Sequence, residues 1–491
     1  MASASARAGF PALLIRADGF GAQGAFAEAQ AQFLEPDVQS VQALQSALER
    51  SALGVVAHFY MDAELQGALS AVAAAGYKHI HVADSLQMAD RALLMAAGGA
   101  RAIVVLGVDF MAENVRAMLD AGGYAHIPVY RVAESAIGCS LAESAEARGY
   151  GAYLERAART PRSLHIVYVN TSLRVKAQAQ RILPTITCTS SNVVPLMLQA
   201  FAQVPDLHVW FGPDTYMGSN LASMLEAFAG MDASAAARLH PQHTPQTLAA
   251  ARERFHWFQQ GLCIVHHMFG SNVVERVKRE YPDALISAHL EVPGEMFALG
   301  FQAQLAGRGV VGSTSNILDF ISHKVDEAAG ASASASDKPL QFVLGTEAGM
   351  TTAIARKVQG QLRKLHESGV RAPNVEIVFP VASEAIAQTG DEQLPIIPGV
   401  AAGEGCTTAG GCATCPHMKM NSLDALMSLI ELVQRDDAAV LAPYKPKAYR
   451  EQLDGHSIAE LGTRSIVRMR DFHKQGQLSS ELVAEITRSA T

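Results

Sequence analysis

The segment LGVVAHFYMDAELQGALSAVAAAGYKHIHVADS, residues 53–85, decides the fold class. Each end of it is a short apolar run with β-branched residues that do not alternate with polar ones. Such runs are typical of strands that are buried on both faces of a parallel sheet. The stretch between them, residues 63–76, has helical composition and ends at a glycine. A strand, a helix and a second strand in series predict an α/β fold with right-handed crossovers.

The same pattern recurs along the chain in three groups of runs. The other predicted strands are RAIVVLGVDF (101–110), LHIVYVNTS (164–172), TITCTSSN (185–192), LHVWFGPD (207–214), GLCIVHHMF (261–269), ALISAHLE (284–291), GVVGSTSN (309–316), QFVLGTE (341–347) and VEIVFPVA (375–382). The tetrapeptide Thr-Ser-Ser-Asn at 189–192 is similar to Ser-Thr-Ser-Asn at 313–316. We therefore predict an internal triplication, with three small α/β units in series.

The runs and the composition between them predict five segments. These are an N-terminal extension (1–45), a first α/β unit (46–150), a second (151–260), a third with a cysteine-rich loop (261–425) and a C-terminal helical segment (426–491). The low-complexity stretch 328–337 is predicted to be a linker or surface loop, and 372–393 a surface excursion. The first ten residues resemble a short transit peptide in composition, although a frayed terminus is the simpler interpretation.

Composition excludes several classes of protein. The 491 residues are 49% hydrophobic and 18% charged, which is enough apolar material for large cores and excludes a disordered chain. A formal charge of −8 argues against a nucleic-acid binder. Every apolar run is far shorter than the ~18 residues of a membrane-spanning helix, so no membrane association is expected. Six cysteines are too few for a disulfide scaffold and indicate a reducing compartment.

Polar side chains gather where the predicted strands end. The pairs are His58 and Tyr60, Asp84 and Ser85, Tyr168 and Asn170, Thr189 and Ser190, Cys263 and His266, His289 and Glu291, and Ser313 and Thr314. Any one pair could simply cap a helix. Because ligands of open parallel sheets bind beyond the carboxyl ends of the strands, the seven pairs together predict one shared site.

Two of these strand ends predict an anionic ligand. The tetrapeptides at 189–192 and 313–316 each precede a helix, and free N–H groups at a helix start bind phosphate or carboxylate. Plain helix capping is the alternative. His58, His266 and His289 could bind the same anions or a metal, or serve as structural hydrogen-bond donors.

The cysteines leave three interpretations open. Three of them lie in GEGCTTAGGCATCPHMKMN, residues 403–421, and the others are Cys139, Cys188 and Cys263. The first interpretation is a structural zinc held by Cys406, Cys412, Cys415 and His417. The second is a redox pair of Cys412 and Cys415. The third is an iron–sulfur cluster that takes one thiolate from each unit, since cysteine followed by proline is typical of such loops. Cys188 is expected to be a small buried strand residue.

The motifs taken together resemble the quinolinate synthase family, the iron–sulfur enzymes of de novo NAD biosynthesis. The matching segments occur in the family's order and cover most of residues 50–425. They are VAHFYMDAELQ (56–66), ADSLQMA (83–89), VLGVDFMAENV (105–115), IGCSLAE (137–143), YVNTSLRVKA (168–177), TCTSSNVV (187–194), GPDTYMG (212–218), GLCIVHHMF (261–269), AHLEVPGE (288–295), VGSTSNI (311–317), LGTEAGM (344–350) and GCATCPHMKMN (411–421).

The resemblance implies a fold, a cofactor and a reaction. Three α/β units would surround a pseudo-threefold axis, with a [4Fe–4S] cluster at their shared interface. Cys139, Cys263 and Cys415 would be its ligands, leaving the fourth iron open as a Lewis acid. Members of the family are transferases. They condense iminoaspartate with dihydroxyacetone phosphate to form quinolinate, and phosphate and water are released.

The resemblance also implies roles for the strand-end residues. Tyr60 would transfer protons on the triose with His58 beside it, and Glu291 would be the second acid/base, near His289. Three residues would position the substrate, namely Tyr168, Asn170 and His266. Four hydroxyl residues would bind phosphate and carboxylates, namely Ser85, Ser190, Ser313 and Thr314.

The chain departs from the shorter bacterial pattern, with His289-Leu290-Glu291 where many members have His-Pro-Glu, and His266-His267 where others have one histidine. It resembles the longer plant-type branch, but without the sulfur-transfer domain that is fused upstream there. We therefore expect the cytoplasm first and a plastid as the alternative. The partners implied are the two small-molecule substrates, L-aspartate oxidase as a functional link and the iron–sulfur assembly machinery; a homodimer is compatible, and no nucleic acid is expected.

Two other functions stay open at this stage. One is an iron–sulfur hydro-lyase of the aconitase type, which would also leave one iron open. The other is a non-catalytic zinc-binding or redox-switch protein. Metal content separates the second from the rest, because a cluster carries about four irons and a structural site one zinc.

Overall fold

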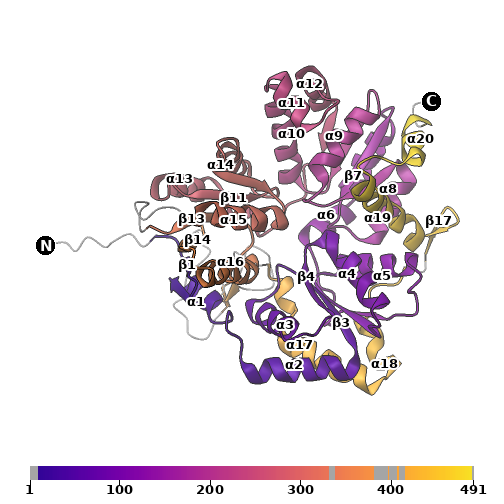
Figure 1. Cartoon of the computed structure of the whole chain (residues 1–491). Helices are drawn as coiled ribbons and strands as arrows, with labels where there is room; N and C mark the ends of the chain where they lie inside the picture. Colours follow the sequence, from indigo (N-terminus) through magenta and orange to yellow (C-terminus); the bar gives the residue numbers. More distant parts are fainter. Residues whose placement is uncertain are drawn as a thin grey trace. The chain divides into compact units, whose positions relative to one another are not determined.

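The computed structural model of the chain describes residues 9–330, 338–380, 396–397, 406–407, 415–449 and 451–488 (Figure 1). The chain divides into two compact units that each combine several stretches. Unit 1 contains residues 1–40, 62–68 and 264–419, and unit 2 contains residues 41–61, 69–263 and 420–491. No described helix is long and apolar enough to cross a membrane.

Unit 2 contains two four-stranded parallel sheets. The first has the order β4 (Ile80–Ala83), β3 (Leu53–His58), β5 (Ala102–Leu106), β6 (Val129–Tyr130). The second has the order β8 (Thr185–Cys188), β7 (Ser163–Tyr168), β9 (His208–Gly212), β10 (Phe255–Trp257). Every residue of β3 and β7 is buried, as non-alternating apolar runs predict.

Unit 1 contains one sheet of six strands. Its parallel part has the order β12 (Gly309–Gly312), β11 (Leu285–His289), β13 (Leu340–Gly345), β14 (Val375–Val378). Two antiparallel strands follow, β1 (Ala12–Ile15) on β14 and β2 (Phe20–Gln23) on β1. In all three sheets the four parallel strands follow the same order, second-first-third-fourth along the chain. The predicted α/β fold with parallel-sheet units is confirmed, and the pseudo-threefold axis stays a prediction.

Helices connect the strands throughout. Those of unit 1 are α1 (Ala25–Ala31), α13 (Ser271–Glu280), α14 (Gly294–Leu305), α15 (Thr314–Ala328) and α16 (Met350–Glu367). Those of unit 2 are α4 (Ser85–Ala97), α5 (Asp109–Ala121), α6 (Ser140–Glu146), α7 (Arg148–Ala158), α8 (Leu173–Ile182), α9 (Val193–Gln203), α10 (Thr215–Ala229), α11 (Ala233–Leu239) and α12 (Pro245–Glu253). The helices α2 (Val38–Ser51) and α3 (Ala63–Ala74) contain residues of both units. Short 3₁₀ turns are η1 (His266–Met268), η3 (Met418–Met420) and η4 (Ala442–Tyr444), and small hairpins are β15 (Ile396–Ile397) with β16 (Cys406–Thr407) and β17 (Gln452–Leu453) with β18 (His456–Ser457).

The C-terminal segment is helical, as predicted, and belongs to unit 2. It contains α17 (Leu423–Arg435), α18 (Ala438–Leu441), α19 (Ile458–Gln475) and α20 (Ser480–Arg488). Helix α19 packs on α8 and β8, where Ser465 hydrogen-bonds Thr187 at 2.9 Å. A Cβ atom at Gly462 would lie 2.6 Å from the carbonyl oxygen of Leu173, so only glycine permits this close helix packing.

The strand predicted at 261–269 is wrong. This stretch contains η1 and loop, and the fourth strand of the second sheet is β10, a few residues earlier. The N–H of Gly261 donates to the side-chain Oγ1 of Thr215 at 3.0 Å, and the carbonyl of Gly261 accepts from the Thr215 N–H at 2.7 Å. A Cβ at Gly261 would lie 2.2 Å from the Pro213 carbonyl oxygen. The segment that begins at Gly261 is therefore held against the loop of Pro213 and Thr215, and it does not pair in a sheet.

Other predicted boundaries remain predictions. Residues 9–31, expected as part of an N-terminal extension, contribute β1, β2 and α1 to unit 1. Most of the predicted linker at 328–337 and of the surface excursion at 372–393 lies outside the described residues, as do residues 1–8.

Candidate active site

The first strand of each parallel sheet ends in two polar residues spaced two apart. They are His58 and Tyr60 at the end of β3, Tyr168 and Asn170 at the end of β7, and His289 and Glu291 at the end of β11. His58 Nδ1 accepts the backbone N–H of Tyr60 at 3.2 Å, and His289 Nδ1 accepts that of Glu291 at 3.3 Å. This geometry assigns the ring proton of each neutral histidine to Nε2. The two strand ends therefore repeat one local structure in separate units.

The second strand of each sheet is followed by a helix, and α4 and α15 are capped by a side chain. Asp84 accepts from the N–H of Gln87 at 3.0 Å at the start of α4. Asn192 accepts from the N–H of Thr189 at 2.8 Å, and Asn316 accepts from the N–H of Ser313 at 2.9 Å. Ser313 in turn caps α15 by accepting the N–H of Asn316 at 3.2 Å. Helix capping, one of the two expected roles, is confirmed for Asp84 and Ser313 and does not exclude ligand binding.

Within unit 2, the ends of β4 and β8 lie side by side. The hydroxyl of Ser191 donates to the carboxylate of Asp84 at 3.1 Å. Ser85 and Ser190, each next to one of these residues in the chain, are both partly exposed. Two of the predicted anion-binding serines are therefore carried by strand ends that contact each other.

Two of the predicted cluster ligands also approach each other in unit 2. Cys139 is the residue before α6, and Cys263 lies in the loop after β10. The hydroxyl of Ser140 donates to the carbonyl of Leu262 at 2.9 Å, so the residues adjacent to the two cysteines are hydrogen-bonded. Both cysteines are partly exposed, which gives their thiols access to a ligand. This donor set fits soft thiolate ligation.

Cys188 behaves differently, as expected for a small buried strand residue. It is the last residue of β8 and is fully buried. Burial raises the pKa of the Cys188 thiol, because the charged thiolate is disfavoured away from water. It is therefore suited to packing rather than to ligation.

The end of β11 in unit 1 places a carboxylate between two imidazoles. Glu291 Oε2 lies 3.2 Å from His266 Nδ1, and Glu291 Oε1 lies 3.6 Å from His289 Nδ1. The two rings stack with centroids 4.8 Å apart and planes 9° from parallel. All three side chains are buried. Since groups that exchange protons are in direct contact here, the cluster can hold or relay a proton.

A further acid at the end of β13 holds the third predicted ligand. Glu347 accepts from the N–H of Cys415 at 2.8 Å and from that of Gly349 at 3.2 Å. Burial raises the pKa of Glu347 to about 8, and these two N–H donors oppose the rise. No role is predicted for Glu347 from the sequence, although an acid directly after a buried apolar run was the available signal. Cys412 lies outside the described residues, so the zinc and redox-pair interpretations are not tested.

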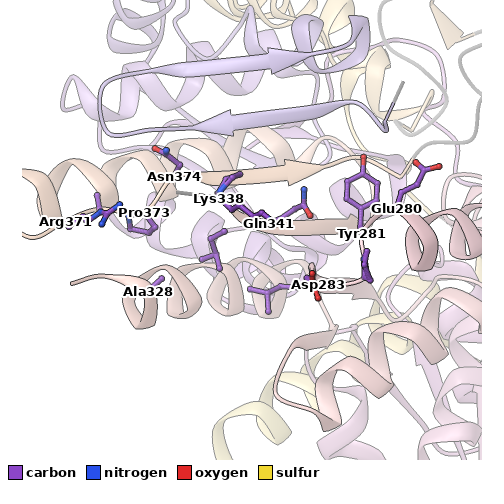
Figure 2. Close-up of a pocket in the computed structure, with 14 residues that line it drawn as sticks. Glu280, Tyr281, Asp283, Ala328, Lys338, Gln341, Arg371, Pro373 and Asn374 are labelled. Carbon is purple, nitrogen blue, oxygen red and sulfur yellow. The ribbon is translucent and has the colours of Figure 1, made fainter. Parts of the chain in front are cut away.

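A cavity of about 760 Å³ in unit 1 lies elsewhere (Figure 2). Its lining includes Leu285 and Leu340, the first residues of β11 and β13, and Asn374, which precedes β14. Figure 2 shows Lys338, Gln341, Asn374 and Tyr281 around it. The cavity therefore opens at the amino ends of these strands, whereas the predicted site residues of unit 1 follow the carboxyl ends. It is not the predicted site.

Comparison with known proteins places the chain in a family. Residues 41–449 match the family model described as "Quinolinate synthetase A protein". The chain is 49% identical over 484 residues to "Quinolinate synthase, chloroplastic" of Nicotiana tabacum, an alignment that covers 97% of the chain and 67% of that relative. The protein of the same name from Arabidopsis thaliana is 48% identical over 488 residues, with 97% and 67% covered. That from Oryza sativa subsp. japonica is 46% identical over 496 residues, with 97% and 69% covered.

The family match includes the parallel strands of all three sheets and every strand end described above. The motifs that carry the resemblance lie within the matched residues. The chain belongs to the quinolinate synthase family.

Proposed function

We propose that the chain condenses iminoaspartate with dihydroxyacetone phosphate to quinolinate, with release of phosphate and water, as an alkyl-transferring transferase of NAD biosynthesis. One observation supports this most: the family match spans residues 41–449 and includes all the polar strand ends. Both substrates are anions, and the helix starts that follow β4, β8 and β12 carry hydroxyl side chains suited to anions. The hydro-lyase and zinc-switch alternatives are not favoured by the comparisons.

The proposed cofactor is a [4Fe–4S] cluster held by Cys139, Cys263 and Cys415. The hydrogen bond between Ser140 and Leu262 supports a shared position for the first two ligands. Pro416 restricts Cys415 to extended geometry, and Glu347 binds its backbone N–H, so the backbone that carries the third thiol is restrained. When bound, the cluster supplies a Lewis acid at its open iron.

Tyr60 is proposed to move protons on the triose. Its backbone N–H is fixed on His58, and the two rings meet edge to face with centroids 4.6 Å apart. A phenol is neutral near pH 7 and can donate a proton, then regain it, when a base lies beside it. His58, whose Nε2 carries the proton in the assigned tautomer, would orient the phenol or the substrate.

Glu291 is proposed as the second acid/base. A carboxylate beside an imidazole can take a proton from the substrate and share it with the ring of His266. His266 would orient Glu291 and the substrate, and Tyr168 and Asn170 would position the substrate in unit 2. The serines at 85, 190 and 313 and Thr314 would bind phosphate and carboxylate groups through hydroxyls and helix N–H donors.

The setting of the reaction is also proposed. A source of iminoaspartate such as L-aspartate oxidase must supply the first substrate, and the iron–sulfur assembly machinery must load the cluster. Of the two expected compartments, the plastid gains support, because the three relatives named above are called chloroplastic. The pseudo-threefold axis, the five segments and a homodimer remain part of the proposal.

Metal analysis of anaerobically purified protein tests the function first. We expect about four irons and four sulfides per chain. A quinolinate assay with both substrates should then give product, and dehydration of a tricarboxylate should not occur. One zinc per chain without sulfide would contradict the proposal, and so would tricarboxylate turnover without quinolinate.

A further inference from the structure

Lys176 on α8 is a buried cation close to the end of β7. Its side chain is fully buried, with 0% of its surface exposed. Its Nζ donates to the carbonyl of Val169 at 3.1 Å, to the hydroxyl of Thr171 at 3.0 Å and to the carbonyl of Thr171. An ammonium has three protons, so these three acceptors satisfy it completely. The contacts all fall on one short segment of chain.

That segment is a tight turn with Asn170 at its centre. The N–H of Thr171 donates to the carbonyl of Val169 at 2.7 Å, which closes a three-residue turn. The hydroxyl of Thr171 donates to the carbonyl of Tyr168 at 3.1 Å. The ammonium of Lys176 therefore binds the carbonyls on both sides of Asn170. Asn170 itself remains partly exposed.

A buried carboxylate compensates the charge of Lys176. Glu113 on α5 accepts from the N–H of Leu173 at 2.8 Å, at the start of α8, and from the Tyr449 hydroxyl at 2.9 Å. Burial lowers the pKa of Lys176 to about 7, and the carboxylate of Glu113 opposes that shift. The turn, α8 and α5 are thus connected through buried charged groups, which is a costly arrangement if it serves packing alone.

We propose that Lys176 is a positioning residue that fixes Asn170 in the orientation in which Asn170 binds substrate. This rests on the proposed function, in which Asn170 contacts the substrate. Lys176 is buried and acts only through the turn. A merely structural lysine would affect stability to the same extent whether or not Asn170 were present, and would not change substrate affinity through it.

A double-mutant cycle in the cluster-loaded, full-length enzyme tests this. The variants are Lys176→Met, Asn170→Ala and the double variant, with quinolinate formation measured as dihydroxyacetone phosphate is varied. L-aspartate oxidase supplies iminoaspartate in situ. We expect Lys176→Met to raise KM about tenfold or more and to change kcat less, with iron content and circular dichroism unchanged. In the Asn170→Ala background the same substitution should change KM by less than about twofold.

The outcomes distinguish the positioning role of Lys176 from the substrate-binding role of Asn170. An equal KM increase in both backgrounds would overturn the positioning role, whereas an Asn170→Ala enzyme with unchanged kinetics would overturn the assigned binding role of Asn170 first.

If Lys176→Met does not fold, Thr171→Val removes one acceptor and keeps the lysine. It should raise KM by a smaller factor. Thr187→Val is its matched control, since this buried threonine bonds Ser465 on α19, and its KM should be unchanged. An unchanged KM in Thr171→Val would count against the proposal.

Discussion

Two buried histidine sites differ in what their partners permit. In the second sheet of unit 2, His165 Nδ1 lies 2.7 Å from the Trp210 carbonyl and Nε2 lies 3.0 Å from the Tyr150 hydroxyl. A carbonyl only accepts, so Nδ1 must carry the proton and Nε2 must accept from the phenol. At the end of β11 in unit 1, His289 and His266 instead contact the carboxylate of Glu291.

The difference shows which buried polar groups can do chemistry. The neighbours of His165 fix its tautomer, and burial lowers its pKa to about 4, so it stays neutral and structural. Glu291 Oε2 faces Nδ1 of His266, so a proton can be shared between these two groups, whereas His289 Nδ1 accepts the N–H of Glu291. Burial alone therefore does not mark a functional residue, whereas the identity of its partners does.

The largest effect is expected at the cysteines. Cys263→Ser should abolish the iron–sulfur chromophore and the activity, because a hydroxyl replaces a soft thiolate poorly at iron. Cys188→Ser is the matched control, since Cys188 is fully buried in β8, and it should keep both. Absorbance, iron and sulfide are measured anaerobically on each purified variant. Full iron loading in Cys263→Ser would show that the ligand assignment is wrong.

At the end of β11, Glu291→Gln should lower kcat by about 10²–10⁴-fold, because the amide keeps the shape but cannot take a proton. Iron content and thermal midpoint should match the wild type. Glu295→Gln is the control, because Glu295 is exposed on α14, where it accepts a hydrogen bond from the Ser271 hydroxyl at 2.8 Å. Wild-type turnover in Glu291→Gln would remove the proton-transfer role and, with it, the distinction between the two histidine sites.

His165→Phe should affect stability and not turnover. It leaves the Tyr150 hydroxyl and the Trp210 carbonyl without their buried partner, at a cost of about 1–3 kcal/mol for each group. The urea midpoint should fall, while kcat and KM of the folded enzyme should not change. A loss of turnover without a loss of stability would place His165 among the reacting groups.

The smallest expected effect is a pH dependence of stability. The pKa of His165 is lowered to about 4 in the folded state from 6.5, so the unfolded chain binds more protons between these values. Stability from this group is complete above pH 6.5 and falls as the pH drops towards 4, by about 2 kcal/mol between pH 7 and pH 5. Urea unfolding at both pH values should show this loss of unfolding free energy in the wild type and not in His165→Phe. Equal pH slopes for the two proteins would contradict the shift.

Most strands of the three main sheets could be predicted from the sequence. A buried parallel strand is a local apolar run, so it can be identified without knowing which strand it pairs with. The exceptions were short or ambiguous. Strand β10 has only three residues, and the run at 261–269 has only Ile264 and Val265 as β-branched residues, so local composition could not decide between loop and strand. The deciding contact, Gly261 against Pro213, is long-range.

For the candidate site, too, features that depend on local sequence could be predicted from the sequence. Residue pairs such as His58 and Tyr60 could be located because strand ends face one edge of a sheet. Lys176 could not, although its acceptors Val169 and Thr171 are only five to seven residues away, because a lysine on a helix is usually exposed. Glu347 could not either, since its partner Cys415 is distant in the sequence. Hydrogen bonds between distant segments leave no periodic trace in a sequence.

Product labelling tests the central claim most directly. The anaerobically purified enzyme is given iminoaspartate formed from ¹⁵N-aspartate together with ¹³C-labelled dihydroxyacetone phosphate, and quinolinate is identified by mass spectrometry. We predict quinolinate that carries both labels, with Cys139→Ser producing none. Absence of doubly labelled quinolinate from cluster-loaded wild-type protein would contradict the proposed reaction.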